Sequence, residues 1–279
     1  MPKPLLPIIR IAKYTIADEV RQRSFIVMTV ICAVFIFLVR GCYHSDYMVN
    51  GQELDAGQMV IMLSKIIFNV ITVGVMFLAA LLSMRIFRRE RDDGTQSSIL
   101  SKPITRWQYV AGKVLGLWVL LTIFMFVLHG IVFMITSINL RIVMPEYLIA
   151  SLLCSFNLLF VVVTVLLLSL VMPDAAAFLC IMGIGFVGTV ADGIFALSHN
   201  PMMAQAIMQQ EGPQSNFTFW QVVYYLWPKL SGAQHYASSF IGREEAGVLG
   251  SVYPLINIIA YCLILGALLF LRFRKEDIV

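Results

Sequence analysis

The sequence has few charged residues: Lys, Arg, Asp and Glu make up 13% of its 279 residues, whereas 59% are hydrophobic. The mean hydropathy is +0.85. A soluble domain typically needs about 25% charged residues to keep its surface hydrated. This shortage of charge excludes a water-soluble domain, and lipid is the expected solvent for most of the chain.

Several catalytic and nucleotide-binding motifs are also missing. The sequence has no Gly-x-x-x-x-Gly-Lys-Ser/Thr stretch, so it lacks the usual loop that holds nucleotide phosphates. It has no His-Glu-x-x-His and no Gly-x-Ser-x-Gly, which argues against an intramembrane metallopeptidase or serine hydrolase. Its five cysteines do not have metal-ligand spacing. The sequence therefore predicts no catalytic residue, no metal site and no cofactor held by this chain.

What the sequence does contain is long apolar stretches. A helix rises 1.5 Å per residue, so about 20 mostly apolar residues are needed to cross the core of a bilayer. Six stretches meet or approach this requirement: residues 24–39, 60–84, 115–138, 147–171, 175–197 and 248–271. The sequence therefore predicts an all-α integral membrane protein with six transmembrane helices.

The basic residues are distributed unevenly among the segments between these helices. Of the 20 Lys and Arg residues, 15 lie before the first span, between the second and third, or after the sixth. Lys and Arg accumulate in cytoplasmic segments, so both termini are expected in the cytoplasm of a multi-pass cell-membrane protein. The net charge of +4 follows from this rule, and a nucleic-acid partner is not expected.

Residues 1–23 are predicted to form an amphipathic N-terminal helix, ahead of a six-helix transmembrane domain over residues 24–279. Leu5, Ile9, Ala12, Ile16 and Val20 recur at spacings of three and four, although Ile11 falls on the more polar side. This pattern favours a helix that lies on membrane lipid at the interface. A plain extension of the first span is the alternative.

Residues 85–113 make up the one substantial internal segment on the predicted cytoplasmic side. Asp92 and Asp93 can cap a short helix, Pro103 stops it, and Thr105 with Gln108 has the spacing of a capping box for the next long helix. A short helix held between two spans can transmit force from the cytoplasm into the bundle. The segment is thus the best candidate for a docking surface, with a solvated loop as the alternative.

The predicted outer loop, residues 198–247, is the longest stretch that does not span the membrane. Its aromatic part, residues 217–227, is too short to cross and favours the interface, so we expect it to skim or re-enter the outer leaflet. A structural lid and a substrate gate both fit this composition.

Few polar residues fall inside the predicted spans. Asn69, His129 and Asn157 are possible pathway residues, although hydrogen bonds between packed helices are the favoured explanation for them. Lys65 and Asp192 lie toward the outer ends of their helices, where they can approach the interface. An ion-coupled carrier or channel would be expected to place more ionisable residues in the bundle.

The segment after the second span resembles the type-2 permeases of ABC transporters. In that family a Glu, a Gly-Thr pair, a Leu-Ser-x-Pro-Ile-Ser/Thr-Arg turn and a Gly-Lys pair follow the second span in this order. The matching residues here are Glu90, Gly94, Thr95, Leu100, Pro103, Arg106, Gly112 and Lys113. The amphipathic first helix, the six spans and the large loop before the last span extend the resemblance over the whole chain.

The resemblance implies a permease subunit that works with a separate ATP-binding subunit, which would hold ATP and Mg, and with a second permease copy or a relative. The eight matching residues would form the coupling motif, with Glu90 and Arg106 as the main polar contacts. Such proteins are more often exporters, and a bacterial cytoplasmic membrane is the expected location. The alternatives are an ion-coupled carrier or channel, and a membrane anchor that does not transport.

Overall fold

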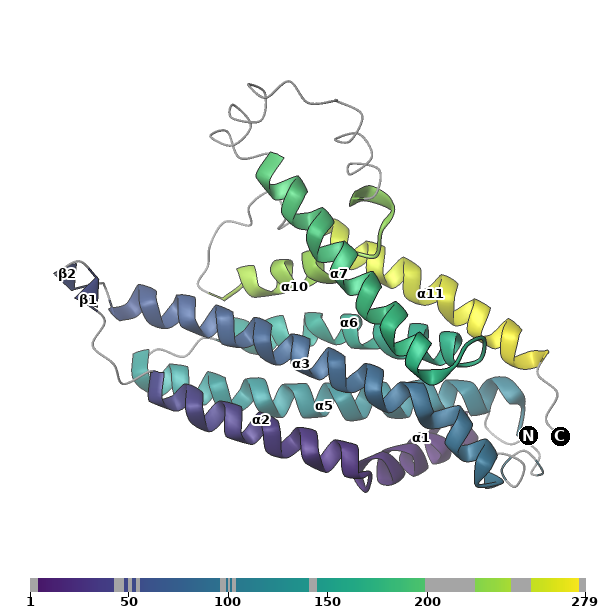
Figure 1. Cartoon of the computed structure of the whole chain (residues 1–279). Coiled ribbons are helices and arrows are strands. Elements are labelled where there is room, and N and C mark those ends of the chain that lie inside the picture. The colour runs from purple at the N-terminus through teal and green to yellow at the C-terminus, as the bar shows by residue number, and fades with distance from the viewer. Residues whose placement is uncertain are drawn as a thin grey trace.

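The structure is a computed structural model that describes residues 5–42, 48–49, 52–53, 56–95, 99, 101, 104–140, 145–198, 224–241 and 252–275. These residues form a bundle of long helices with one two-stranded antiparallel pair at one end (Figure 1). The two strands, β1 (Met48–Val49) and β2 (Gln52–Glu53), pair Met48 with Glu53. The predicted all-α class is therefore confirmed, apart from this short pair.

Eight helices make up the described fold. They are α1 (Leu5–Val20), α2 (Arg23–Cys42), α3 (Ala56–Asp92), α5 (Arg106–Leu140), α6 (Glu146–Ser169), α7 (Asp174–Ser198), α10 (Leu230–Ser239) and α11 (Tyr253–Arg274). In Figure 1 the start of α1, the end of α3, the start of α5 and the end of α11 lie at one end of the bundle, which we call the junction end.

Five helices are long and apolar enough to cross a membrane: α3, α5, α6, α7 and α11. α1 and α2 pass the same test only as a pair bent by 66°, which would raise the number to six. Within the described residues, the predicted first span, 24–39, is therefore counted only together with α1. α1 carries Arg10, Lys13, Asp18 and Glu19 within its 16 residues, so it is too polar to lie across a bilayer core. The predicted start of the last span at residue 248 lies outside the described residues, and α11 begins at Tyr253.

The centre of the bundle is α6, which contacts α3, α5, α7, α10 and α11. Its side chains are buried on most sides, including Ala150, Cys154 and Leu158 with no exposed area. By contrast, only 22% of the most apolar stretch of α7 is buried within the chain, and the same share holds for α11. These two helices leave broad apolar surface for lipid or for another protein subunit.

α1 lies along the start of α5, where two glycines allow a close approach. A Cβ atom at Gly116 would lie 2.9 Å from Thr15 Cβ and 2.9 Å from the Ala12 carbonyl oxygen. The side of α1 that the sequence pattern made more polar, including Ile11 and Thr15, is the one buried against α5. In the predicted apolar stripe Ile9 is 52% exposed and Val20 is 41% exposed, whereas Ala12 and Ile16 are half-buried, so apolar side chains of α1 lie on more than one face.

Part of the predicted outer loop enters the bundle. α10 has 10 residues, too few to cross a membrane, yet it packs against α6, α7, α11 and α3 (Figure 1). Its small residues Gly232, Ala233 and Ala237 face the neighbouring helices and are buried. The prediction that residues 217–227 skim or re-enter the outer leaflet stays a prediction, because most of this aromatic run lies among residues 199–223, outside the described part.

Candidate functional site

The junction end contains a buried ion pair between α3 and α5. Lys113 Nζ donates to Glu90 Oε1, and the Tyr109 hydroxyl donates to Glu90 Oε2. Tyr109 and Lys113 are four residues apart, so both project from the same face of α5 toward α3. The Lys113 side chain has no exposed area and that of Glu90 is 3% exposed. Both carboxylate oxygens of Glu90 are thus used inside the protein.

A second layer of charge joins α1 to this pair. Arg89, next to Glu90 on α3, forms ion pairs with Asp18 and, at 3.2 Å, with Glu19. Gln22 also donates to Glu19, whose side chain has no exposed area. Burial raises the pKa of Glu19 to about 7, and the Arg89 guanidinium partly offsets this rise. Glu19 therefore titrates near neutral pH while bound to a permanent cation.

Gly112, which precedes Lys113, allows α1 to pack closely against α5. A Cβ atom there would lie 2.7 Å from Ile11 Cβ, closer than real Cβ contacts. The Lys113 ammonium also lies 5.2 Å from the centre of the Tyr14 ring of α1. We call Tyr14, Asp18, Glu19, Arg89, Glu90, Tyr109, Gly112 and Lys113 the junction cluster.

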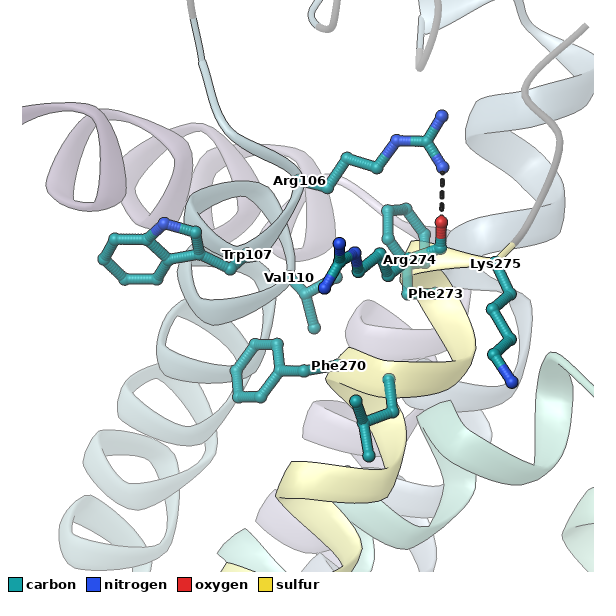
Figure 2. A pocket seen from close by; sticks show the side chains of 8 residues that line it. Arg106, Trp107, Val110, Phe270, Phe273, Arg274 and Lys275 are labelled. Carbon is teal, nitrogen blue, oxygen red and sulfur yellow. Dashed lines mark hydrogen bonds between the residues drawn. The ribbon is translucent and has the colours of Figure 1, made fainter.

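α11 and α7 also reach this end of the bundle. Arg106, at the start of α5, donates to the Arg274 carbonyl at 3.0 Å (Figure 2). Phe273 of α11 stacks on Tyr109 with ring centres 5.6 Å apart. Arg88 of α3 pairs with Asp174 at the start of α7 at 3.3 Å. Five helices therefore meet around the two ends of the 85–113 segment.

The structure brings together only part of the coupling motif. Glu90, Gly112 and Lys113 lie in the junction cluster, while Leu100 and Pro103 fall outside the described residues. Gly94 has a φ of +66°, the left-handed conformation that ends α3, and its N–H donates to the Arg91 carbonyl at 3.1 Å. Thr95 follows directly. Among the described residues the motif is thus split between a turn and a buried contact.

Two details of the segment bear on the sequence predictions. One of the two hydrogen bonds of the predicted capping box is present, because the Thr105 N–H donates to Gln108 Oε1 at 3.1 Å just before α5 begins. Arg106 is exposed, as a polar contact for a partner should be. Glu90 is buried, so in this structure it does not offer its carboxylate to a partner, and its place between α3 and α5 suits a positioning role.

A second buried ion pair lies away from the junction end. Lys229, just before α10, donates to Asp192 of α7 at 3.0 Å, and the two side chains are 2% and 4% exposed. The Lys229 N–H donates to Asn257 of α11 at 3.2 Å, and its ammonium lies over the Tyr224 ring. Burial lowers the pKa of Lys229, and the bond to Asp192 opposes this. The Asp192 side chain is thus buried within the chain, and its expected place near the membrane interface stays a prediction.

The three possible pathway residues all make hydrogen bonds within the bundle. Asn157 of α6 donates to the Leu230 carbonyl at 3.0 Å, and Gln234 of α10 donates to Asn69 Oδ1 of α3 at 3.1 Å. His129 of α5 lies 2.9 Å from Ser151 and stacks on Phe68. These bonds suit helix packing; a role in a substrate pathway stays a prediction.

The residues around α10 form what we call the re-entrant cluster: Asn69, Asn157, Asp192, Lys229, Gln234 and Asn257. In the part of the chain that the structure describes, Asp192 Oδ2 and Asn157 Oδ1 are buried acceptors without a hydrogen-bond partner. The sequence analysis missed the Asp192–Lys229 pair. Its only signal was a lone acid and a lone base, 37 residues apart, in otherwise apolar surroundings.

Within the described residues, no group of three or more His, Cys, Asp or Glu side chains is placed to hold a metal ion. A comparison with protein families matches residues 9–278 to the ABC-2 family transporter proteins. A comparison with curated proteins found no match.

Proposed function

Since this chain belongs to the ABC-2 family of transporter proteins, we propose that it is the permease subunit of an ATP-driven transporter. A separate ATP-binding subunit would hydrolyse ATP, because the sequence has no P-loop. The junction end would face the cytoplasm of a bacterial cell, as the distribution of basic residues favours. Export is the proposed direction, in keeping with the family resemblance.

The observation that carries this proposal is the Glu90–Lys113 pair. It joins the two helices that flank the 85–113 segment, and Arg89 joins the same place to α1. Breaking a buried ion pair by moving one partner costs about 3–5 kcal/mol. A push on the segment would therefore move α1, α3 and α5 together, rather than bending the loop alone.

Docking and transmission would fall to different residues of the segment. Arg91, Asp92, Asp93 and Arg106 are exposed and can meet charged groups on a partner. Glu90 and Lys113 are buried and would transmit the movement once the partner has bound. This division revises the expectation that Glu90 itself contacts the ATP-binding subunit.

The experiment is co-purification of the tagged chain in mild detergent, followed by an ATPase assay of the complex. Asp93→Arg should weaken retention of the ATP-binding subunit, because it reverses an exposed charge on the docking surface. Lys113→Met should retain the subunit but lose the coupling of ATPase activity to the permease. Lys13→Glu, an exposed charge reversal on α1 outside the segment, is the matched control.

Two results would count against the proposal. The first is a wild-type chain that purifies without any P-loop-containing subunit under conditions that preserve membrane complexes. The second is an unchanged complex and unchanged ATPase coupling in both variants of the segment. A loss in Lys13→Glu as large as that in Asp93→Arg would show that the effect does not belong to the segment.

An ion-coupled carrier is a second candidate, favoured by the buried Asp192–Lys229 pair. Ionisable residues inside membrane bundles often lie on ion or proton pathways. The two functions separate in proteoliposomes, where a carrier moves substrate under a proton gradient without ATP. The ATP-driven transporter needs ATP and its partner subunit.

A further inference from the structure

A groove opens at the junction end between the first turn of α5 and the last turn of α11 (Figure 2). Its volume is about 790 Å³. It is lined by Arg106, Trp107, Val110, Phe270, Leu271, Phe273, Arg274 and Lys275. Among these described residues three are basic and none is acidic, so the groove selects for an anion.

The positive charges that line the groove come from the two helices that form it. The Arg106 guanidinium donates to the Arg274 carbonyl at 3.0 Å, which ties the start of α5 to the end of α11. In Figure 2 the Arg274 side chain extends from α11 toward Val110 of α5. The N-terminus of the 35-residue α5 adds its own partial positive charge at this point. An anion placed here would meet charge from both helices.

The rest of the groove is apolar, and part of it is open. Val110 and Phe273 form a buried floor, at 0% and 1% exposure. Trp107 is 49% exposed and Leu271 is 56% exposed. Trp favours the boundary between headgroups and acyl chains, and basic pockets at the cytoplasmic ends of membrane helices suit lipid phosphates. This combination fits a ligand with an anionic head and an apolar tail better than a free anion.

We propose that this groove binds the headgroup of an anionic phospholipid. The phosphate would lie beside the Arg274 guanidinium, which Figure 2 shows extending toward α5, while Lys275 on the other side of the last turn of α11 would add positive charge. An acyl chain would follow Phe270 and Leu271 along α11. This goes beyond the proposed transport function, and its test needs no ATP hydrolysis. Because Phe273 of the floor stacks on Tyr109, the bound lipid would also brace α11 against the junction cluster.

The test is native mass spectrometry of the full-length chain in detergent, titrated with dioleoyl-phosphatidylglycerol or dioleoyl-phosphatidylcholine. The wild type should prefer phosphatidylglycerol. Arg274→Gln and Lys275→Gln should each weaken that binding about fivefold, since one basic residue contributes about 1 kcal/mol to anionic-lipid binding. Phosphatidylcholine binding should not change. Both substitutions keep the Arg274 carbonyl that accepts from Arg106, so the helix contact remains.

Arg272→Gln is the matched control, because Arg272 is an exposed base in the last turn of α11 that does not line the groove. It should leave phosphatidylglycerol binding unchanged. An equal loss in Arg272→Gln would mean diffuse charge attraction rather than a site. Competition by millimolar inorganic phosphate as strong as that by the lipid would assign the groove to a free anion. Either result overturns the proposal.

Two other occupants would also be recognised. If the wild type shows no lipid preference and Arg274→Gln instead releases the ATP-binding subunit, the groove is a protein-docking surface. If lipid preference arises only when Glu276→Gln and Asp277→Asn are combined, the chain's own carboxylates fill the groove. Both outcomes contradict the lipid assignment.

Discussion

The described residues contain two buried Lys–carboxylate pairs whose surroundings differ. Glu90 of the junction cluster uses both carboxylate oxygens, one for Lys113 and one for Tyr109. Asp192 of the re-entrant cluster uses one oxygen for Lys229 and, within the described structure, leaves the other buried without a partner. A fully satisfied pair fixes one arrangement of helices, whereas a partly satisfied pair loses less when it separates.

This difference suggests how the molecule divides its work. The junction cluster joins continuous helices, and its ion pair between α3 and α5, Glu90 with Lys113, links residues 23 apart in the sequence. The re-entrant cluster holds a short helix, α10, that begins at Leu230, shortly after Pro228, and ends at Ser239. We expect the first region to move as one body and the second to be the place where contacts change.

The largest effect is expected from Lys113→Met. It leaves the Glu90 carboxylate buried without its cation, which should cost about 3–5 kcal/mol of unfolding free energy. The double variant Glu90→Gln with Lys113→Met removes both charges and should recover most of that stability. Thermal unfolding of the purified chain in detergent measures both. A double variant no more stable than the single one would show that the pair is not a self-contained unit.

Lys229→Met should have a smaller effect, about 2–3 kcal/mol, because Asp192 already tolerates one buried oxygen without a partner. The structural change should also be confined to α10 and its surroundings. Cysteine labelling at Ser239, in the last turn of α10, should become faster while labelling at the junction end stays the same. A loss of stability larger than that of Lys113→Met would reverse the ranking of the two regions.

The two regions also differ in how far the sequence could predict them. Glu90, Gly112 and Lys113 stand in a motif, and the Thr105–Gln108 capping box follows from spacing, since these signals act over a few residues. Their burial could not be predicted, because it depends on α1 packing across α5. The pair of Asp192 and Lys229 depends on a loop that folds back into the bundle, and no local pattern encodes that contact.

The N-terminal helix shows the same limit. Its outward stripe, Ile9 and Val20 among others, was visible as a helical period. The second face, with Ile11 and Thr15, looked like an imperfection because its partner surface belongs to α5. Helix existence was thus predictable from composition, and helix contacts required the fold.

Gly112→Ala tests the close contact between α1 and α5. The added methyl group would lie 2.7 Å from Ile11 Cβ, so one helix must shift, at a cost of about 2 kcal/mol. Gly130→Ala, on the same helix, is the matched control, because nothing lies within 4 Å of its Cβ position. Thermal unfolding should separate the two, with the control unchanged or slightly more stable. Equal stability of both variants would mean that the packing of α1 on α5 does not require the close contact at Gly112.

The smallest effect is expected from pH at Glu19. Its pKa of about 7 lies above the ordinary value of 4.5, so the folded state binds a proton more tightly than the unfolded state. The resulting stability is complete below about pH 4.5 and is lost as pH rises through 7. From pH 6 to pH 8 the wild type should lose about 1 kcal/mol, a loss that Glu19→Gln should abolish because its side chain cannot ionise. If the unfolding free energies of the two proteins change equally with pH, Arg89 keeps Glu19 charged over the whole range. The junction cluster would then be insensitive to pH between 6 and 8.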